Sequence, residues 1–294
     1  MSEVASTPTV PLFSEALSTL VADVASSVIA LHSHHARFSG FVWRPGLIVT
    51  ADEALPEDGE VTVMAPGGET LAASVVGRDP TTDVALLRIN GENLRPVTFT
   101  SGSPRAGELA LVVGMQDASP TVALGVVSLA ASGWRSLRGG EIDARIELAV
   151  AMRGSAEGGV VVDATGRVMG MAVYGPRRQV LVIPSATIDR VAAQLESHGR
   201  IARGYLGLGL QPVGLNDGTT GIMVMGVDAR SPGAEADIRQ GDVIVAWDEQ
   251  PIGSLQTLLR ALTADKIGAA VRLSLMRAGE PMTVSVTIGE RPRT

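Results

Sequence analysis

Few residue types in this chain can carry out chemistry at neutral pH. There is no cysteine, which excludes a thiolate nucleophile, a disulfide framework and cysteine-ligated zinc or iron–sulfur clusters. Of only four histidines, three lie close together as His32, His34 and His35. On a strand, His32 and His34 would share one face at a spacing that can hold a metal ion. A solvated loop between two strands explains the same pattern, and we favour the loop.

Charge and composition narrow the classes of partner. The chain has 294 residues, 45% of them hydrophobic, which is enough for two domains that each bury a core. Its 24 basic and 31 acidic residues give a net charge of −7, which argues against binding nucleic acid or anionic lipid through positive charge. The most apolar early stretch, residues 17–31, is broken by polar side chains and is too short to cross a bilayer. We therefore expect no nucleic-acid partner and no membrane span.

The elements that must position any site fall into two groups. Short β-branched runs separated by Gly, Pro and Asp dominate residues 28–183, which predicts an all-β barrel or sandwich. Apolar residues at helical spacing then predict a helix that opens at Ser185 and stops at Gly199. A second unit follows from Arg203, with further strands and a helix over residues 254–262. The domain boundary is expected near residues 198–204.

Several motifs in order resemble the HtrA/Deg family of trypsin-like serine proteases, followed by that family's PDZ domain. The protease motifs are Ser39-Gly-Phe-Val, Gly46-Leu-Ile-Val-Thr, Asp79-Pro-Thr-Thr-Asp-Val-Ala-Leu-Leu, Leu124-Gly-Val-Val-Ser and Gly158-Gly-Val-Val-Val-Asp; the PDZ motifs are Arg203-Gly-Tyr-Leu-Gly-Leu, Ser231-Pro-Gly-Ala-Glu-Ala and Gly241-Asp-Val-Ile. The resemblance implies an all-β chymotrypsin-like double β-barrel followed by a PDZ domain, a small β-barrel with helices. It divides the chain into an N-terminal segment 1–24, a trypsin-like domain 25–200 and a PDZ domain 203–292.

The catalytic triad that the resemblance implies is not intact. Its aspartate matches Asp83, but Glu53 stands at the histidine position and Glu157 at the serine position, with Ser155 in place of a glycine of the oxyanion loop. A carboxylate is a poor nucleophile toward an amide, and it repels the negative charge that develops on the substrate oxygen. We interpret the domain as a degenerate, non-catalytic protease. A displaced nucleophile at Ser155 is the alternative.

The altered triad would gather carboxylates in one cleft if the barrels form as the resemblance implies. Glu53, Asp83 and Glu157, with Asp52 beside them, must share a proton, recruit a cation or point apart. A divalent cation such as calcium, magnesium or manganese would suit an all-oxygen cluster. A proton-sharing pair could instead activate a water molecule. The reading that we favour pairs Glu157 with Arg153 or another arginine; no other cofactor is expected.

The second domain retains what peptide binding requires. PDZ domains present backbone N–H groups of a short loop to a peptide carboxylate, while the peptide adds as a strand between that loop's strand and a helix. The resemblance assigns the loop and the facing helix to Tyr205, Leu206, Gly207, Leu208, Leu255 and Leu258. The apolar residues predict a preference for a hydrophobic terminal side chain. A PDZ fold that serves only as a spacer in an oligomer is the alternative.

The leading hypothesis is therefore an HtrA-like pseudoprotease that binds peptide C-termini or unfolded protein segments as a scaffold, chaperone-like or regulatory subunit. An active serine or carboxylate hydrolase and a divalent-metal-binding protein are the alternatives. The resemblance also implies a homo-oligomer, possibly a trimer. No basic run followed by an apolar segment opens the sequence, which predicts a cytoplasmic protein, or a periplasmic one if a leader has been trimmed.

Overall fold

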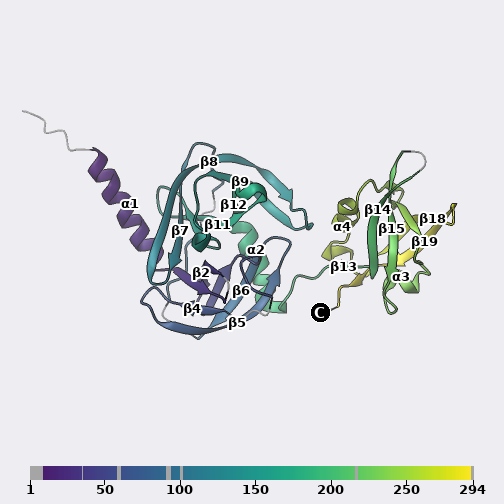
Figure 1. Ribbon diagram of the computed structural model, residues 1–294, viewed down its shortest axis with the longest axis horizontal. Coiled ribbons are helices and arrows are strands. Elements are labelled where there is room, and N and C mark those ends of the chain that lie inside the picture. Colours follow the sequence, from purple (N-terminus) through teal and green to yellow (C-terminus); the bar gives the residue numbers. More distant parts are fainter. Residues whose placement is uncertain are drawn as a thin grey trace, which may run out of the picture. The chain divides into compact units, whose positions relative to one another are not determined.

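The computed structural model describes residues 9–34, 36–57, 61–90, 94–99, 102–215 and 218–292. The chain forms two compact units (Figure 1). The first contains residues up to 136 together with 140–200, and the second contains 137–139 and the residues from 201 onward. Each unit buries apolar cores of its own.

The first unit contains two closed, antiparallel, six-stranded barrels, as the short β-branched runs predict. The first barrel has the strand order β1-β2-β3-β6-β5-β4. Its strands are β1 (Val28–His32), β2 (Arg37–Arg44), β3 (Leu47–Thr50), β4 (Thr62–Met64), β5 (Thr70–Asp79) and β6 (Val84–Ile89). The apolar side chains of β1, β3 and β6 are almost wholly buried, which places the core of this barrel between them.

The second barrel has the strand order β10-β11-β12-β9-β8-β7. Its strands are β7 (Leu109–Gln116), β8 (Ser119–Arg135), β9 (Glu141–Ala149), β10 (Val160–Val162), β11 (Val168–Tyr174) and β12 (Val180–Pro184). Two short 3-10 turns interrupt the connections, η1 (Gly154–Ala156) before β10 and η2 (Pro176–Arg178) between β11 and β12. These two turns contribute to the candidate site described below.

Two helices belong to the first unit. Helix α2 (Ser185–His198) is the predicted one, and Gly199 ends it in the left-handed conformation (φ +71°) with its N–H donating to the Leu195 carbonyl. Helix α1 (Thr9–Ala25) was not predicted from the sequence. It extends away from the barrels (Figure 1) and is attached at its C-terminal end, where Val24 and Ala25 are buried. No helix in the described part of the chain is long and apolar enough to cross a membrane.

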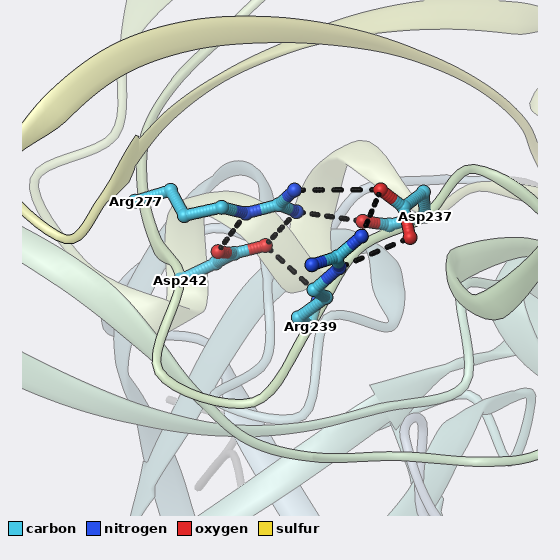
Figure 2. A network of polar contacts seen from close by, with 4 residues as sticks. All are labelled: Asp237, Arg239, Asp242 and Arg277. Atoms are coloured by element: carbon cyan, nitrogen blue, oxygen red, sulfur yellow. Dashed lines mark hydrogen bonds and ion pairs between the residues drawn. The ribbon is translucent and has the colours of Figure 1, made fainter.

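The second unit is built on an antiparallel sheet with the path β14-β15-β16-β18-β19, in which β17 also pairs with β16. Its strands are β14 (Leu208–Gly214), β15 (Thr220–Val227), β16 (Val243–Trp247), β17 (Gln250–Pro251), β18 (Ala270–Arg277) and β19 (Glu280–Thr287), with β13 (Gly204–Tyr205) paired to β20 (Gly289–Glu290); its helices are α3 (Pro232–Glu235), α4 (Leu255–Ala261) and the 3-10 turn η3 (Ala264–Lys266). A network of two aspartates and two arginines joins the loop after α3 to the end of β18 (Figure 2).

Candidate functional site

A cleft of about 680 Å³ lies in the first unit, lined by residues from both barrels. The segment after β3 contributes Glu53, and the segment around η1 contributes Ser155 and Glu157. The structure thus brings into one cavity the two glutamates that the resemblance assigns to triad positions. Asp83 does not line this cavity but lies behind Glu53, as the next contacts show.

A tight turn places Asp83 at the start of β6. The Asp79 carboxylate accepts hydrogen bonds from the Thr81 hydroxyl (2.6 Å) and the Thr82 hydroxyl (2.7 Å), which closes the turn between β5 and β6. Asp83 follows in the left-handed region at φ +58°, a conformation that Asp tolerates better than most residues. Its Oδ1 then accepts the backbone N–H of Glu53 at 2.8 Å.

The environment of Asp83 favours the protonated carboxyl group. Burial raises the pKa of Asp83, the negative charges of Glu53, Glu157 and Asp52 add to this shift, and the hydrogen bond from the Glu53 N–H opposes it; together they bring the pKa to about 7. In a serine protease this position orients a histidine. Here it is a carboxyl group bonded to a neighbouring amide, so it has no imidazole to orient.

The loop that carries Glu157 is held in a conformation in which the Glu157 backbone N–H is already hydrogen-bonded. The Glu157 N–H donates to the Gly154 carbonyl at 3.1 Å, which closes the η1 turn. Ser39 fixes the loop from the other side, because its N–H donates to the Glu157 carbonyl (2.7 Å) and its hydroxyl to the Ser155 carbonyl (2.6 Å). Gly158 is at φ +79°, and a Cβ there would lie 2.2 Å from the Ser39 carbonyl. An oxyanion site needs N–H groups aimed into the cleft, and that of Glu157 is bonded within the turn.

The side chain of Glu157 is held by the neighbouring strand. Its Oε1 accepts the N–H of Tyr174, at the end of β11, with a donor–acceptor distance of 3.4 Å. Burial raises the pKa of Glu157, and the charge of Glu53 adds to this shift, whereas the Tyr174 hydrogen bond and the positive charge of Arg178 lower it. The arginine whose charge acts on Glu157 is therefore Arg178 and not Arg153, the arginine named from the sequence. No ion pair joins Arg178 and Glu157 among the described contacts.

The carboxylates do not assemble into a cation site. Asp52 is buried and turned toward Arg78, whose Nε lies 2.5 Å from Asp52 Oδ1 and whose Nη2 donates to the Asp52 carbonyl. In the part of the chain that the structure describes, no three histidine, aspartate or glutamate side chains are arranged to hold a metal ion. The metal alternative at Glu53, Asp83, Glu157 and Asp52 therefore has no support in the geometry.

The loop interpretation holds for His34, which is exposed in the loop after β1, but is wrong for His32, which is the last residue of that strand. His32 lies at the end of β1, where its Nε2 is 3.4 Å from a carboxylate oxygen of Asp117 without forming a hydrogen bond. It does not line the cleft, so it cannot serve Ser155 as a base in this arrangement. His35 lies outside the described residues.

The peptide groove expected in the second unit is only partly as predicted. Gly207 has φ +70°, and the N–H groups of Leu206 and Gly207 have no backbone partner among the described residues. Leu206 and Leu258 are 2% and 0% exposed, so they belong to the core and back the groove instead of lining it. This corrects the assignment of these two side chains as groove contacts, and it leaves the Leu206 N–H as a donor for a peptide carboxylate. The reason is that both side chains belong to the apolar core of the second unit, Leu258 from α4 and Leu206 from the segment before β14.

Other side chains are placed to form the surface of the expected groove. Leu208 and Leu255 are partly buried at the edge of the same core, and Leu259, four residues after Leu255 on α4, is 41% exposed. The i, i+4 spacing puts Leu255 and Leu259 on one side of the helix. Tyr205 uses its hydroxyl to donate to a carboxylate oxygen of Asp228, which raises the pKa of Tyr205.

Comparisons with known proteins place these features in a family. Residues 38–171 match the trypsin-like peptidase domain, and residues 204–288 match the PDZ domain. The chain is 32% identical over 272 residues to a Chlamydia trachomatis protein named probable periplasmic serine endoprotease DegP-like, covering 87% of this chain and 54% of that protein. A Rhizobium meliloti protein of the same name is 30% identical over 271 residues, covering 86% and 53%.

Solved structures agree with this result. The serine endoprotease from Yersinia pestis aligns with a TM-score of 0.70 and 25% identity, covering 99% of this chain and all of that one (100%). This chain is a homologue of the DegP and HtrA serine endoproteases. The HtrA-type protease AlgW, solved with a decapeptide, shares the fold, with a TM-score of 0.69 and 22% identity over 94% of this chain and 99% of that one.

These findings confirm the expected fold class, an all-β chymotrypsin-like double barrel followed by a PDZ domain. The DegP homologue spans about half the length of the curated relatives it matches, 54% of the Chlamydia trachomatis protein. Those relatives are named as proteases and as periplasmic. Sequence reasoning did not foresee that Arg37 and Arg178 line the cleft with Arg153, because the loop geometry that gathers them leaves no periodic signal.

Proposed function

We propose that this DegP homologue binds polypeptides without cleaving them. The observation that carries the proposal is the state of the cleft, in which Glu53 and Glu157 occupy the positions of base and nucleophile. The Glu157 N–H, which an oxyanion site would require, is bonded to Gly154. Loss of nucleophile and base removes the proton transfer on which acyl transfer depends.

The PDZ domain supplies the binding half of the proposal. The loop at Leu206 and Gly207 has two backbone N–H groups without a backbone partner in the described structure, as a carboxylate site requires. Leu208, Leu255 and Leu259 give the neighbouring groove an apolar surface. We therefore infer that the ligands are peptide C-termini with a hydrophobic last residue, or unfolded segments that expose such residues.

The decisive test is degradation of unfolded casein by the purified chain, with and without calcium or manganese. We expect no cleavage in any condition. Cleavage that is lost in Ser155→Ala would instead assign the displaced serine as nucleophile, and a serine-reactive phosphonate would then label the protein. Cleavage that is lost only in Glu157→Ala would assign a carboxylate-based hydrolase, the candidate favoured by the raised pKa values of Asp83 and Glu157.

Peptide binding is tested separately on the full chain. Labelled peptides that end in a hydrophobic residue with a free carboxylate should bind, and the same peptides with an amidated terminus should not. Gly207→Val should abolish binding, because a Cβ at this position (φ +70°) would lie 2.0 Å from Ser231 Cβ. Equal binding of the free and amidated peptides would contradict the groove assignment.

Assembly and location complete the proposal. We propose a homo-oligomer, with a trimer as the assembly that the family resemblance implies, and a periplasmic location like the one named for the relatives. Light scattering of the purified chain tests the first. Fractionation of the native host with an antibody to this chain tests the second, and recovery with cytoplasmic markers would contradict it.

A further inference from the structure

Three arginines line the cleft that the lost triad leaves behind. Arg37 comes from β2, Arg153 precedes η1 and Arg178 ends η2, so three separate segments bring an arginine to the lining of the cavity that also contains Glu53 and Glu157. None of the three has a part in acyl transfer by a serine. Their convergence therefore needs a different explanation.

Arg178 is held in place by a strained and well-supported turn. Arg177 and Arg178 both have left-handed backbones, at φ +57° and φ +60°, which is unusual for two successive residues that are not glycine. The Arg178 guanidinium carbon lies 4.4 Å from the centre of the Tyr174 ring, a cation–π contact. The Tyr174 hydroxyl in turn donates to the Met152 carbonyl at 2.6 Å, which fixes the ring.

Arg153 and Arg178 have donors to spare. Neither has a carboxylate oxygen within 4.0 Å in the described part of the structure, whereas Arg37 lies 3.3 Å from a carboxylate oxygen of Asp117. Arg153 is also exposed to solvent. A guanidinium offers five N–H groups in a planar fork that matches the two oxygens of a carboxylate.

Glu157 is the internal competitor for these arginines. Its carboxyl group accepts the Tyr174 N–H, and it lies near enough to Arg178 for that charge to act on it. An incoming carboxylate would be attracted by Arg153 and Arg178 and repelled by an ionised Glu157. The neutral amide of a glutamine at this position would remove the repulsion.

We propose that the cleft binds an acidic side chain of a polypeptide segment, between the guanidinium groups of Arg153 and Arg178. The volume of about 680 Å³ is in the usual range of ligand pockets and exceeds the needs of one side chain. Met152, which is partly exposed on the lining, gives a neighbouring apolar residue of the segment a surface to pack on. The inference rests on the proposed function, because a segment can be retained only where it is not cleaved.

The test measures fluorescence anisotropy of a labelled, N-acetylated and C-amidated peptide with one central glutamate flanked by leucines, and of its glutamine isostere. Amidation removes the carboxylate that the PDZ loop would recognise, so binding reports on the cleft. We expect the full chain to prefer the glutamate peptide by about tenfold, and Arg153→Gln and Arg178→Gln each to remove most of that preference. Glu157→Gln should strengthen binding of the glutamate peptide.

Arg105→Gln is the matched control. Arg105 is exposed and precedes β7, whose other end, at Gln116, lines the cleft. It should bind like the wild type. No binding, equal affinity for the two peptides, or equal loss in Arg105→Gln would overturn the inference, as would weaker binding in Glu157→Gln. Failure of the proposed function would give a different result: mass spectrometry of the same samples would detect a shortened peptide or degraded casein.

Discussion

At the scale of single residues, the site shows how a retained side chain changes its role when its partners change. The resemblance assigns Asp83 to the one triad position whose residue type is kept, and it places a glutamate where an imidazole would stand. Its carboxyl group instead meets the charges of Glu53, Glu157 and Asp52 in a half-buried place. In an active protease this aspartate would stabilise the histidine cation. Here the protonated, neutral form of the Asp83 carboxyl group is favoured instead.

This environment predicts a pH dependence of stability. The pKa of Asp83 is about 7 in the folded chain against an ordinary value of 3.8 for this side chain, so the folded state binds the proton more tightly than the unfolded one. Stability should therefore be fully present below about pH 4 and fall as the pH rises toward and through 7. Asp83→Asn, which keeps an acceptor for the Glu53 N–H, should remove this slope and stabilise the first unit at pH 8 by about 2 kcal/mol after solvent screening.

Urea unfolding at pH 5 and pH 8 measures the effect. Asp23→Asn serves as the control, because Asp23 is a largely exposed partner of Arg95 and surface pairs contribute little. If Asp83→Asn destabilises the chain equally at both pH values, the carboxyl group acts only as a hydrogen-bond acceptor and the argument for a protonated Asp83 fails.

The proposed absence of proteolytic activity gives a second prediction at this scale. Glu53→His with Glu157→Ser restores the side chains of the triad around Asp83, but it leaves the η1 turn in which residue 157 donates its N–H to Gly154. Adding Ser155→Gly frees the loop to adopt another backbone conformation. Because one oxyanion donor is worth about 100-fold or more in rate, we expect the triple variant to cleave casein at least that much faster than the double variant. Equal rates would show that the turn does not limit catalysis.

At the scale of elements, one polar network holds the PDZ domain together. Arg277, at the end of β18, binds Asp242 through Nε (2.8 Å) and Nη2 (2.8 Å), and its Nη2 also donates to the Asp237 carbonyl (2.6 Å). Figure 2 shows Asp237 bridging Arg277 and Arg239. The Asp242 side chain is 1% exposed, so its charge depends on these donors.

Removing that carboxylate should destabilise the second unit. Asp242→Ala leaves Arg277 without its main partner, and loss of one member of a buried pair costs about 3 kcal/mol. Glu249→Ala, which breaks an exposed pair with Arg272, should change stability by less than about 0.5 kcal/mol. Thermal unfolding by circular dichroism compares the two. The hydrogen bond from Arg277 lowers the pKa of Asp242, so its contribution is present above about pH 4 and is lost as the pH falls further.

The elements also show what the sequence could reveal. Strands such as β3 and β6 were predicted because β-branched runs bounded by turn residues identify a buried strand locally. Helix α2 was predicted from its apolar spacing and Gly199. Helix α1 was missed even though Leu17, Leu20 and Val24 recur at helical spacing and lie on its partly buried face. Arg37 and Arg178 were missed because they join Arg153 on the cleft lining only through barrel closure and two short turns.

At the scale of the whole molecule, helix α1 has more apolar surface than the chain itself covers. Val10, Leu12 and Phe13 are 78%, 50% and 47% exposed near the free end of the helix (Figure 1), whereas Val24 and Ala25 are buried at the attached end. Val122 and Leu124 on β8 are also exposed, at 47% and 46%. Large apolar side chains gathered on a protruding element are typical of a contact with another chain.

This surface leads to a prediction about assembly. If the homo-oligomer forms through α1, then Leu12→Glu with Phe13→Glu should convert it to a smaller species, because two charges would be buried without partners. Stability of the separate chain should be unchanged, since both side chains are half exposed. Light scattering after size exclusion measures the mass, and Ser18→Glu, an exposed change on the opposite side of α1, is the control. A wild-type mass in the double variant would place the oligomer contact elsewhere, with the exposed β8 residues as the next surface to test.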